Sequence, residues 1–535
     1  MHHMIQSCKH CNTVFTITGE DQAFYDKVSP VFNEQKLSIP PPELCPECRQ
    51  KMRLRFQNER NLYGRQCDLC KKDIIAVYPR DTVGPVYCPE CWWSDKWNAF
   101  DYGLDIEWSK NIASYWRKLL SNVPKLSLVS LNSENTVYAH DAENNKNCYL
   151  VFTTINSEDS LYLSDSIKMR NCIDCFGSAN CELCYNVISG EDCYNCFHCI
   201  HCYQISFSYF CYDCQNCSNC FGCFNINHKE YHIFNKPYEK EVYEKQIAIY
   251  KERMKTWQGY EEVWDEVKEF WQTQPHKYAA NVSLNCTGDF LANSKNCEES
   301  FNVVYSLDCK YIYDCVDMKD SQDCNISGHA ELIYNCQSCS GFMNICCSFC
   351  AHSSNLYYCD HCFNCTNCFG CVGLTHQNYC IYNKQYSQEE YEKLIPRIID
   401  QMKSNWGEFF PSEIAPISEL DCVINDFFPA STDKRIDTIV KEAKVYPEVV
   451  DNKMQCIACN KDFLIIKQEQ VFYQTHQLPF PPLCPTCRHR RRIQQRNPRI
   501  LYSRKCNKCG QPVTSTFAES NPVQIYCEKC YQEAR

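Results

Sequence analysis

The chain has 535 residues, more than the roughly 250–300 that one hydrophobic core commonly holds, so we expect several domains. It contains 47 cysteines but only 15 glycines. No run of about 18 apolar residues occurs, which argues against a membrane-spanning helix. The formal net charge of −11 excludes a protein covered on all faces with nucleic-acid contacts.

The compartment follows from the cysteines and the first residues. The opening MHHMIQSCKHCN offers no apolar stretch that would form the core of a signal peptide. We therefore expect a cytoplasmic protein whose thiols are kept reduced, where Cys-x-x-Cys pairs bind metal. The alternative is an exported protein held by disulfides.

Eight Cys-x-x-Cys pairs gather at the two ends of the chain as two copies of one module. From the second pair onward both copies read CxxC-x18-CxxC-x17-CxxC, and the flanks also match, as in LYGRQC (62–67) and LYSRKC (501–506). This agreement indicates an internal duplication. The N-terminal pairs are Cys8/Cys11, Cys45/Cys48, Cys67/Cys70 and Cys88/Cys91, and the C-terminal pairs are Cys456/Cys459, Cys484/Cys487, Cys506/Cys509 and Cys527/Cys530.

Paired cysteines at this spacing are typical of structural zinc. Two thiolates separated by two residues can face one tetrahedral ion, and a second pair closes the shell without leaving a catalytic position. We predict four zinc ions, each held by two consecutive pairs: the first with the second pair, and the third with the fourth, in both modules. Interleaved pairing and buried unligated thiols are the alternatives.

The terminal modules resemble a "probable zinc-binding" ribbon or treble-clef family found in bacteria of the candidate phyla radiation. The resemblance rests on a CxxC followed by an aromatic residue (Phe15, Phe463), a Gln-x-Phe-Tyr run (22–25, 470–473), a Leu-Cys-Pro-x-Cys-Arg knuckle and an Arg/Asn-rich run ending in Leu-Tyr. It covers the two terminal modules and not the middle of the chain, and what it implies is zinc binding.

The middle of the chain is a second duplication. NCFGC at 219–223 returns at 367–371, and Asn235-Lys236-x-Tyr238 returns as Asn383-Lys384-x-Tyr386, at the same interval. Within each copy, cysteines recur with a 21-residue period, as at Cys172, Cys193 and Cys214. A period near 20 predicts a parallel β-solenoid whose coils stack on one another.

The dipeptide Asn-Cys occurs eleven times in the chain. Asn tolerates left-handed backbone at corners, and cysteine is a small hydrophobe, so we expect corners at Asn and an inward ladder of cysteines. Additional zinc and iron–sulfur clusters are the alternatives. Runs such as 193–202, with a cysteine at every third residue, look like cluster sequences but lack the terminal x3-Cys-Pro.

Charged amphipathic helices are predicted at about 238–257 and 387–404, and another at about 107–121 that caps the beginning of the solenoid. The predicted fold class is mainly β with capping helices, in which terminal zinc-ribbon or treble-clef modules flank two tandem parallel β-solenoid repeats. The boundaries are a double zinc-ribbon module at 1–98, a capping helix at 99–125, solenoid repeat 1 at 126–235, a helical linker at 236–277, solenoid repeat 2 at 278–385, a helix and linker at 386–452, and a double zinc-ribbon module at 453–535.

One basic stretch is the candidate for nucleic-acid contact. Between Cys484 and Cys506 the chain carries +8 with no acidic residue. Arginine forks suit phosphate, and the neighbouring Tyr502 can stack on a base. The alternatives are that these arginines neutralise zinc-bound thiolates or pair with the acidic solenoid. The stretch comprises Arg488, Arg490, Arg491, Arg492, Arg496, Arg499, Arg504 and Lys505.

No catalytic constellation, phosphate loop or dinucleotide fingerprint occurs, so the prediction is that the protein is not an enzyme and has no small-molecule substrate. The leading interpretation is a zinc scaffold or adaptor that contacts RNA, DNA or a ribonucleoprotein through its terminal modules. One alternative is a self-assembling or protein-binding unit. The other is a protein that handles metal or redox equivalents with its solenoid cysteines.

Overall fold

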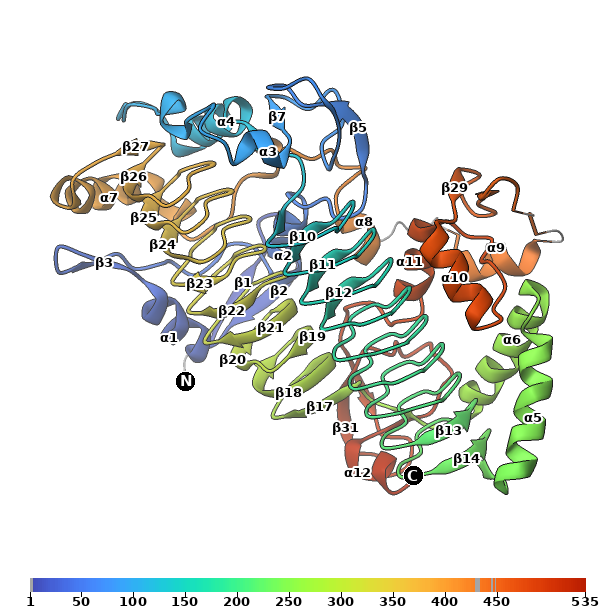
Figure 1. Ribbon diagram of the computed structural model, residues 1–535. Helices are drawn as coiled ribbons and strands as arrows, with labels where there is room; N and C mark the ends of the chain where they lie inside the picture. The colour runs from blue at the N-terminus through green and yellow to red at the C-terminus, as the bar shows by residue number, and fades with distance from the viewer. Residues whose placement is uncertain (1–2, 429–433, 444–445, 448) are drawn as a thin grey trace. The chain divides into compact units, whose positions relative to one another are not determined.

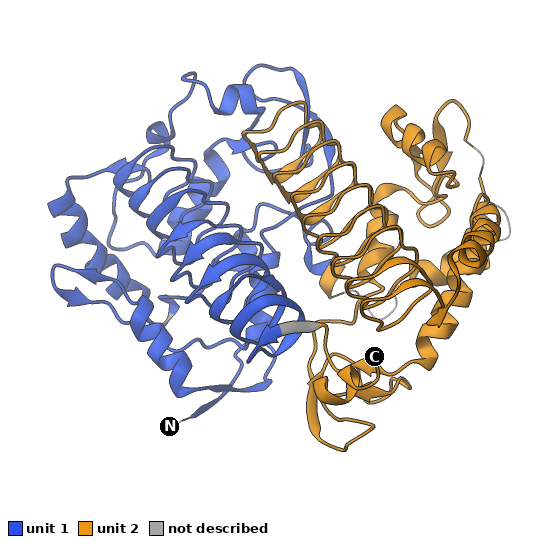
Figure 2. Ribbon diagram, turned by 60° about the horizontal axis from the view of Figure 1, so that its bottom comes forward, with its two compact units in different colours: residues 1–129, 281–425 blue, residues 130–280, 426–535 orange. Residues whose placement is uncertain are grey.

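The computed structural model describes residues 3–428, 434–443, 446–447 and 449–535 (Figure 1). It divides into two compact units, each made of two separate parts of the chain (Figure 2). Unit 1 joins 1–129 to 281–425, and unit 2 joins 130–280 to 426–535. Each cysteine module is therefore grouped with the repeat that lies farther from it in the sequence.

Each unit contains a stack of short parallel coils, which we call the first coil stack (130–235, unit 2) and the second coil stack (281–385, unit 1). Parallel backbone bridges join each position to its equivalent in the next coil, as in Glu182 with Tyr194. A left-handed residue recurs at nearly every third position, for example Asn171 and Asp174. Four such three-residue steps make one turn. Each coil therefore has four short sides, and one left-handed residue belongs to each side.

The coil length differs from the 21-residue period seen in the cysteines. Every third residue points into the core of the stack. Two cysteines separated by any multiple of three residues therefore both point inward, whatever the length of the coil. The cysteine period is seven such steps, whereas the hydrogen bonding between coils repeats after four. The runs of Cys-x-x-Cys in the stacks are successive inward positions of one coil.

Asparagine and cysteine occupy the places expected of them. Asn171, Asn180 and Asn195 have φ near +50°, and the cysteine after each is buried. The core of each stack consists largely of cysteine side chains, with scattered Val, Leu and Ile. Each thiol lies within hydrogen-bond distance of backbone carbonyls to which its one S–H can donate, as Cys172 does of Arg170 O at 3.2 Å and of Cys181 O at 3.3 Å. Buried thiols are thereby satisfied without a metal ion.

Unit 2 contains the first coil stack, two long helices and the C-terminal cysteine module (residues 450–535). Its elements are β9 (Ser130–Leu131), β10 (His140–Glu143), β11 (Phe152–Ile155), β12 (Ser164–Ile167), β13 (Ser218–Phe221), β14 (Glu230–Ile233), β15 (Lys236–Pro237), α5 (Lys240–Arg253), α6 (Trp257–Thr273), β16 (His276–Lys277), α9 (Ile436–Glu442), β28 (Lys453–Gln455), β29 (Asp462–Leu464), α10 (Lys467–Thr475), α11 (Pro485–Ile493), β30 (Tyr502–Lys505), β31 (Pro512–Ser515), β32 (Ile525–Tyr526) and α12 (Glu528–Gln532).

Unit 1 contains the N-terminal cysteine module (residues 3–98) and the second coil stack. Its elements are β1 (Met4–Ser7), β2 (Val14–Ile17), α1 (Gly19–Val28), β3 (Val31–Phe32), β4 (Gln35–Lys36), α2 (Pro46–Leu54), β5 (Tyr63–Gln66), β6 (Asp73–Ala76), β7 (Val86–Tyr87), α3 (Pro89–Trp92), η1 (Ala99–Tyr102), α4 (Ile112–Asn122), β8 (Lys125–Leu126), β17 (Asn281–Leu284), β18 (Gly288–Glu298), β19 (Ser300–Val304), β20 (Leu307–Lys310), β21 (Tyr313–Lys319), β22 (Gly328–Glu331), β23 (Gly341–Phe342), β24 (Ser353–Tyr357), β25 (Thr366–Phe369), β26 (Asn378–Ile381), β27 (Lys384–Gln385), α7 (Gln388–Met402), η2 (Lys403–Asn405) and η3 (Ser412–Ile414); α8 (Ile424–Phe427) follows at the boundary of the units.

Within the second stack, the coil between β22 and β23 is one residue shorter than the coils on either side of it. Ala330 pairs with Gly341 and Tyr334 with Ile345, so each partner comes one position earlier than in the coils on either side. Gly341 has φ +115°, and a Cβ there would lie 1.9 Å from the carbonyl oxygen of Ser353, so no other residue fits. Equivalent residues of the two stacks are therefore one residue closer in the sequence after this coil than before it.

Helices were predicted near their observed places. α5 and α7 fall within the two predicted charged helices, and each ends the coil stack of its unit: Tyr250 of α5 stacks on Phe221, and Tyr391 of α7 contacts Tyr379. The helix expected to cap the beginning of the first repeat behaves differently. α4 belongs to unit 1, where Trp116 stacks on Tyr358 of the second coil stack.

The broader fold prediction is confirmed, since the described chain is mainly β with helices and has four-cysteine clusters near both termini. Among the described residues, no helix has both the length and the apolar character needed to cross a bilayer. Parts of the predicted helix-and-linker segment 386–452, namely 429–433, 444–445 and 448, lie outside the described residues.

Candidate metal centres

Each cysteine cluster is built from a hairpin and a helix. The first pair follows a strand and ends in a left-handed residue that turns the chain back: Asn12, Lys71, Asn460 or Gly510. The second pair begins a helix, with its first cysteine as the N-cap in α2, α3, α11 and α12. Proline follows that cysteine in three of the four helices, at a position where its missing N–H costs nothing.

The structure brings together the sixteen terminal cysteines in the partition predicted from the sequence. In each group all four sulfur atoms lie within 4.8 Å of one another. The groups are Cys8, Cys11, Cys45 and Cys48; Cys67, Cys70, Cys88 and Cys91; Cys456, Cys459, Cys484 and Cys487; and Cys506, Cys509, Cys527 and Cys530.

The sulfur distances match a tetrahedral zinc shell. Zinc–sulfur bonds of about 2.3 Å imply sulfur–sulfur edges of about 3.8 Å. Measured edges are 3.6 Å for Cys11–Cys45, 3.8 Å for Cys70–Cys88, 3.8 Å for Cys459–Cys484 and 3.7 Å for Cys509–Cys527. The donor set, four sulfurs per group, therefore fits zinc in both composition and size.

The local backbone favours the thiolate form of some of the sixteen cysteines. Hydrogen bonds from Thr13 lower the pKa of Cys11 to about 6. Burial opposes ionisation of Cys67, but backbone N–H groups from Cys70 and Cys88 outweigh it and bring its pKa to about 6. The pKa of Cys506 is lowered to about 6 by the same balance of burial against backbone N–H groups. In the second pairs burial raises the pKa of Cys45, Cys88 and Cys527, and the side chain of Cys456 raises the pKa of Cys484. A metal that binds these thiols must therefore displace their protons.

The helix that follows the first cluster of each module carries two arginines that enter the neighbouring coil stack. In unit 1, Arg49 of α2 contacts Asp323 twice, through Nε and Nη2 at 2.9 Å. Arg53, one turn later, lies 3.6 Å from the same carboxylate and donates to Asn325 and Asn335. Both arginines and Asp323 are at most 2% exposed.

Unit 2 repeats this contact with its own residues. Arg488 and Arg492 of α11 each lie 3.0 Å from Asp174, which is 1% exposed. Arg488 also pairs with Glu469 at 2.8 Å, and Glu469 accepts a hydrogen bond from Tyr162. We call the two contacts Arg49/Arg53 with Asp323 and Arg488/Arg492 with Asp174 the arginine clamps.

Aromatic residues around the clamps are duplicated as well. Arg49 lies over Tyr311, and Arg488 lies over Tyr162, the equivalent tyrosine of the first coil stack. Tyr25 of α1 meets Tyr334 edge to face, and in the same way Tyr473 of α10 meets Tyr185. The module and the coil stack were therefore duplicated together with the surface that joins them.

Sequence reasoning missed Asp174 and Asp323. Their signal was available, because the interval between them in the sequence is the same as that between Tyr162 and Tyr311. An acidic residue that recurs at this interval opposite two duplicated arginines predicts a buried pair.

The residues predicted to contact nucleic acid are divided by the fold. Arg488, Arg491 and Arg492 are buried and paired with carboxylates, as in the alternative that linked these arginines to the acidic repeat. Arg496 lies over Phe176, Arg499 lies over Phe427, and Arg504 donates to the carbonyls of Phe517 and Ala518. Arg490 and Lys505 are exposed.

One comparison with known proteins supports the metal assignment. A family described as a probable treble clef domain matches residues 450–496, which contain the first cluster and the helix α11 of the C-terminal module. No curated protein matches the chain. The N-terminal module has the same hairpin, helix and cysteine grouping, and the four-cysteine clusters support zinc-binding modules near both termini.

Proposed function

We propose that the protein is a non-enzymatic scaffold in which zinc holds four small clusters and the modules fasten two parallel β-solenoid repeats. The observation that carries the proposal is the duplicated arginine clamp. Zinc at Cys45 and Cys48, or at Cys484 and Cys487, fixes the helix from which the clamp arginines project. Metal binding and docking of the module are thereby coupled, as expected where zinc supplies folding energy to a small domain.

The test is the metal content of the full chain purified without added metal. We expect four zinc ions per chain and no visible absorption. Cys487→Ser should lower the content by one ion, whereas Cys286→Ser, a cysteine outside the four groups, should leave it unchanged. Metal well above four per chain, or iron–sulfur colour, would replace this proposal by a protein that handles metal with its coil-stack cysteines.

Nucleic-acid contact is a second candidate, supported by the exposed cations Arg490 and Lys505 on the C-terminal module. Arg490→Ala combined with Lys505→Ala should weaken binding to a mixed-sequence single-stranded RNA and reduce its salt dependence. Lys461→Ala, an exposed cation of the same module, is the matched control. Equal binding by all variants would show that Arg490 and Lys505 do not contact the RNA, and no binding by the unmodified chain would leave a protein-binding or self-assembling unit as the better description.

Two narrower expectations belong to this proposal. The cytoplasmic location expected from the sequence stays a prediction. The resemblance to proteins of the candidate phyla radiation stays a prediction.

A further inference from the structure

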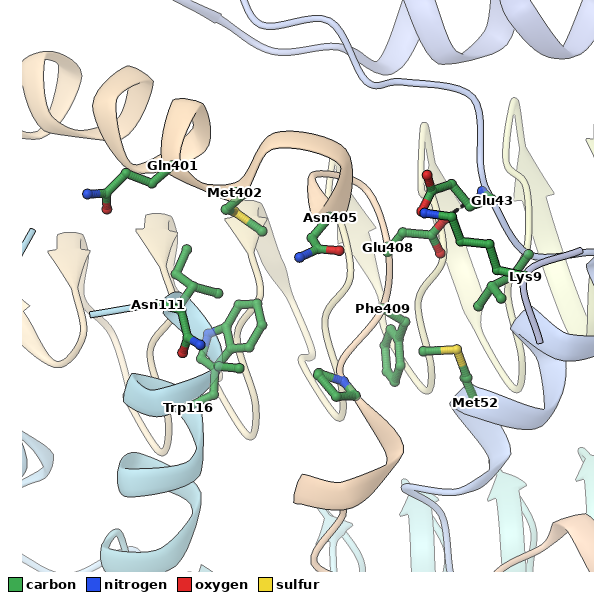
Figure 3. Close-up of a pocket in the computed structure, with 14 residues that line it drawn as sticks. Lys9, Glu43, Met52, Asn111, Trp116, Gln401, Met402, Asn405, Glu408 and Phe409 are labelled. Atoms are coloured by element: carbon green, nitrogen blue, oxygen red, sulfur yellow. Dashed lines mark hydrogen bonds and ion pairs between the residues drawn. The ribbon is translucent and has the colours of Figure 1, made fainter. Parts of the chain in front are cut away.

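Unit 1 contains a cavity of about 310 Å³ beside the clamp helix (Figure 3). It lies among α2, the start of α4, the end of α7 and the segment 405–411. Its walls include the apolar side chains of Met52, Trp116, Met402 and Phe409. This volume is at the lower end of the range for small-molecule sites, so it suits a small ligand and excludes a macromolecule.

One wall of the cavity carries a carboxylate, Glu408, that makes no ion pair among the described residues. Oε1 of Glu408 accepts a hydrogen bond from the Glu43 backbone N–H at 2.9 Å. Oε2 is shielded from water and has no hydrogen-bond partner among the described residues. The nearby ammonium of Lys9 pairs with the Glu43 side chain (Figure 3). A buried acceptor without a partner is unfavourable, and burial accordingly raises the pKa of Glu408.

The duplicated unit shows what balances the same position. Met52 of α2 corresponds to Arg491 of α11, at the same sequence interval by which Arg49 and Arg53 correspond to the clamp arginines of α11. In both helices the clamp arginines lie three residues before and one residue after this position. The side chains of Met52 and Arg491 therefore project from the same side of their helices.

In unit 2 that position holds a cation between acids. The Arg491 guanidinium donates to both oxygens of Glu261 at 2.7 and 2.6 Å, and its Nε donates to Asp437 at 2.7 Å. In unit 1 methionine stands in place of this cation, and the carboxylate of Glu408 lines the same cavity as Met52.

We propose that the cavity of unit 1 binds a small organic cation, whose guanidinium or ammonium head pairs with Glu408 and whose short apolar stem lies against Met52, Trp116 and Phe409. The ligand takes the place that the Arg491 side chain fills in unit 2. A guanidinium head is favoured over ammonium, because the side chain whose place the ligand takes, Arg491, carries a guanidinium that pairs with Glu261.

The experiment titrates the zinc-loaded full chain with n-butylguanidinium, with n-butylammonium and with n-butylurea, a neutral molecule of nearly the same shape. Binding is measured by calorimetry. We expect the guanidinium to bind at least about tenfold more tightly than the urea, since hydrogen bonds to a charged group carry roughly that discrimination. Glu408→Gln should weaken guanidinium binding about tenfold or more, and Glu413→Gln, an exposed neighbour outside the cavity, should not.

Met52→Arg supplies a second arm that does not remove the carboxylate. The new side chain should occupy the cavity as Arg491 does in unit 2, abolish guanidinium binding and leave the chain folded. Equal affinity for the urea and the guanidinium, unchanged guanidinium binding in Glu408→Gln, or no binding of the guanidinium at millimolar concentrations would each overturn the proposal. A normal zinc content in these variants separates this outcome from failure of the scaffold itself.

Discussion

Replacing Asp174 by Asn tests the arginine clamp most directly. The change keeps the shape of the side chain but removes the charge that two buried arginines share, each at 3.0 Å. Arg488 retains Glu469, whereas Arg492 loses the one carboxylate assigned to it among the described residues. Breaking a buried ion pair by removing one partner costs about 3–5 kcal/mol, far more than the roughly 0–1 kcal/mol of an exposed pair.

Hydrogen exchange followed by mass spectrometry measures this loss locally, because a chain of two units need not unfold in a single step. Peptides of α11 and of the first coil stack should lose about 3–5 kcal/mol of opening free energy in Asp174→Asn. The reciprocal change, Asp323→Asn, should act on α2 and the second coil stack. Asp192→Asn, an exposed corner residue of the first stack, is the matched control.

The reasoning is refuted if Asp174→Asn and Asp192→Asn lower protection by the same amount. It is equally refuted if Asp174→Asn destabilises α2 as much as α11. Either result would mean that the buried charges do not hold the module to its coil stack.

Three further predictions concern metal, pH and backbone. Removing zinc with a chelator should expose sixteen of the 47 thiols to rapid modification by a thiol reagent, because the remaining cysteines, apart from half-buried Cys286, are buried. Many more reactive thiols would show that the coil stacks unfold when the metal is removed. Burial lowers the pKa of His198 to about 3 in the folded chain. Between about pH 6.5 and pH 3 this histidine is therefore protonated in the unfolded chain but neutral in the folded chain. Stability of unit 2 should therefore fall on acidification from pH 6.5 towards 3, by about 2 kcal/mol at pH 5, and His198→Asn should remove that part of the slope in urea unfolding; an identical slope would contradict it. Gly341→Ala should lower the free energy of opening of the second coil stack by more than about 1 kcal/mol, while Gly64→Ala, which meets no atom within 4 Å, should change it little; hydrogen exchange distinguishes the two.

The metal clusters were predictable because their information is local. A Cys-x-x-Cys pair encodes its own turn, and the duplicated spacing indicated which residues were equivalent. The grouping of Cys8 and Cys11 with Cys45 and Cys48 agreed with the structure for this reason. The corners at Asn and the inward cysteines were likewise predictable from the conformational preference of one residue and the size of the next.

The coil length was not predictable from cysteine spacing alone. Every third residue points inward, so a cysteine period of seven such steps is compatible with coils of any whole number of steps. The coil length is set by backbone hydrogen bonds between coils, and these do not depend on which side chains are present. The grouping of modules with coil stacks was also not predictable from the sequence. Segments that are adjacent in the chain usually pack together, and that rule would have placed each module with the nearer coil stack. The contact of Arg49 with Asp323 instead joins opposite halves of the sequence.

These distances imply an order in which the parts associate. Closing the 274-residue loop between Arg49 and Asp323 costs about 3 kcal/mol more in chain entropy than closing the loop between successive bridges of a stack. Coils can therefore form from contacts between near neighbours, and each cysteine module can fold around its own metal, before either arginine clamp closes. Because the clamp arginines Arg49 and Arg488 directly follow cluster cysteines Cys48 and Cys487, a module without metal would present them from an unfixed helix. In the proposed scaffold, a module would therefore join its distant coil stack only after it has bound zinc.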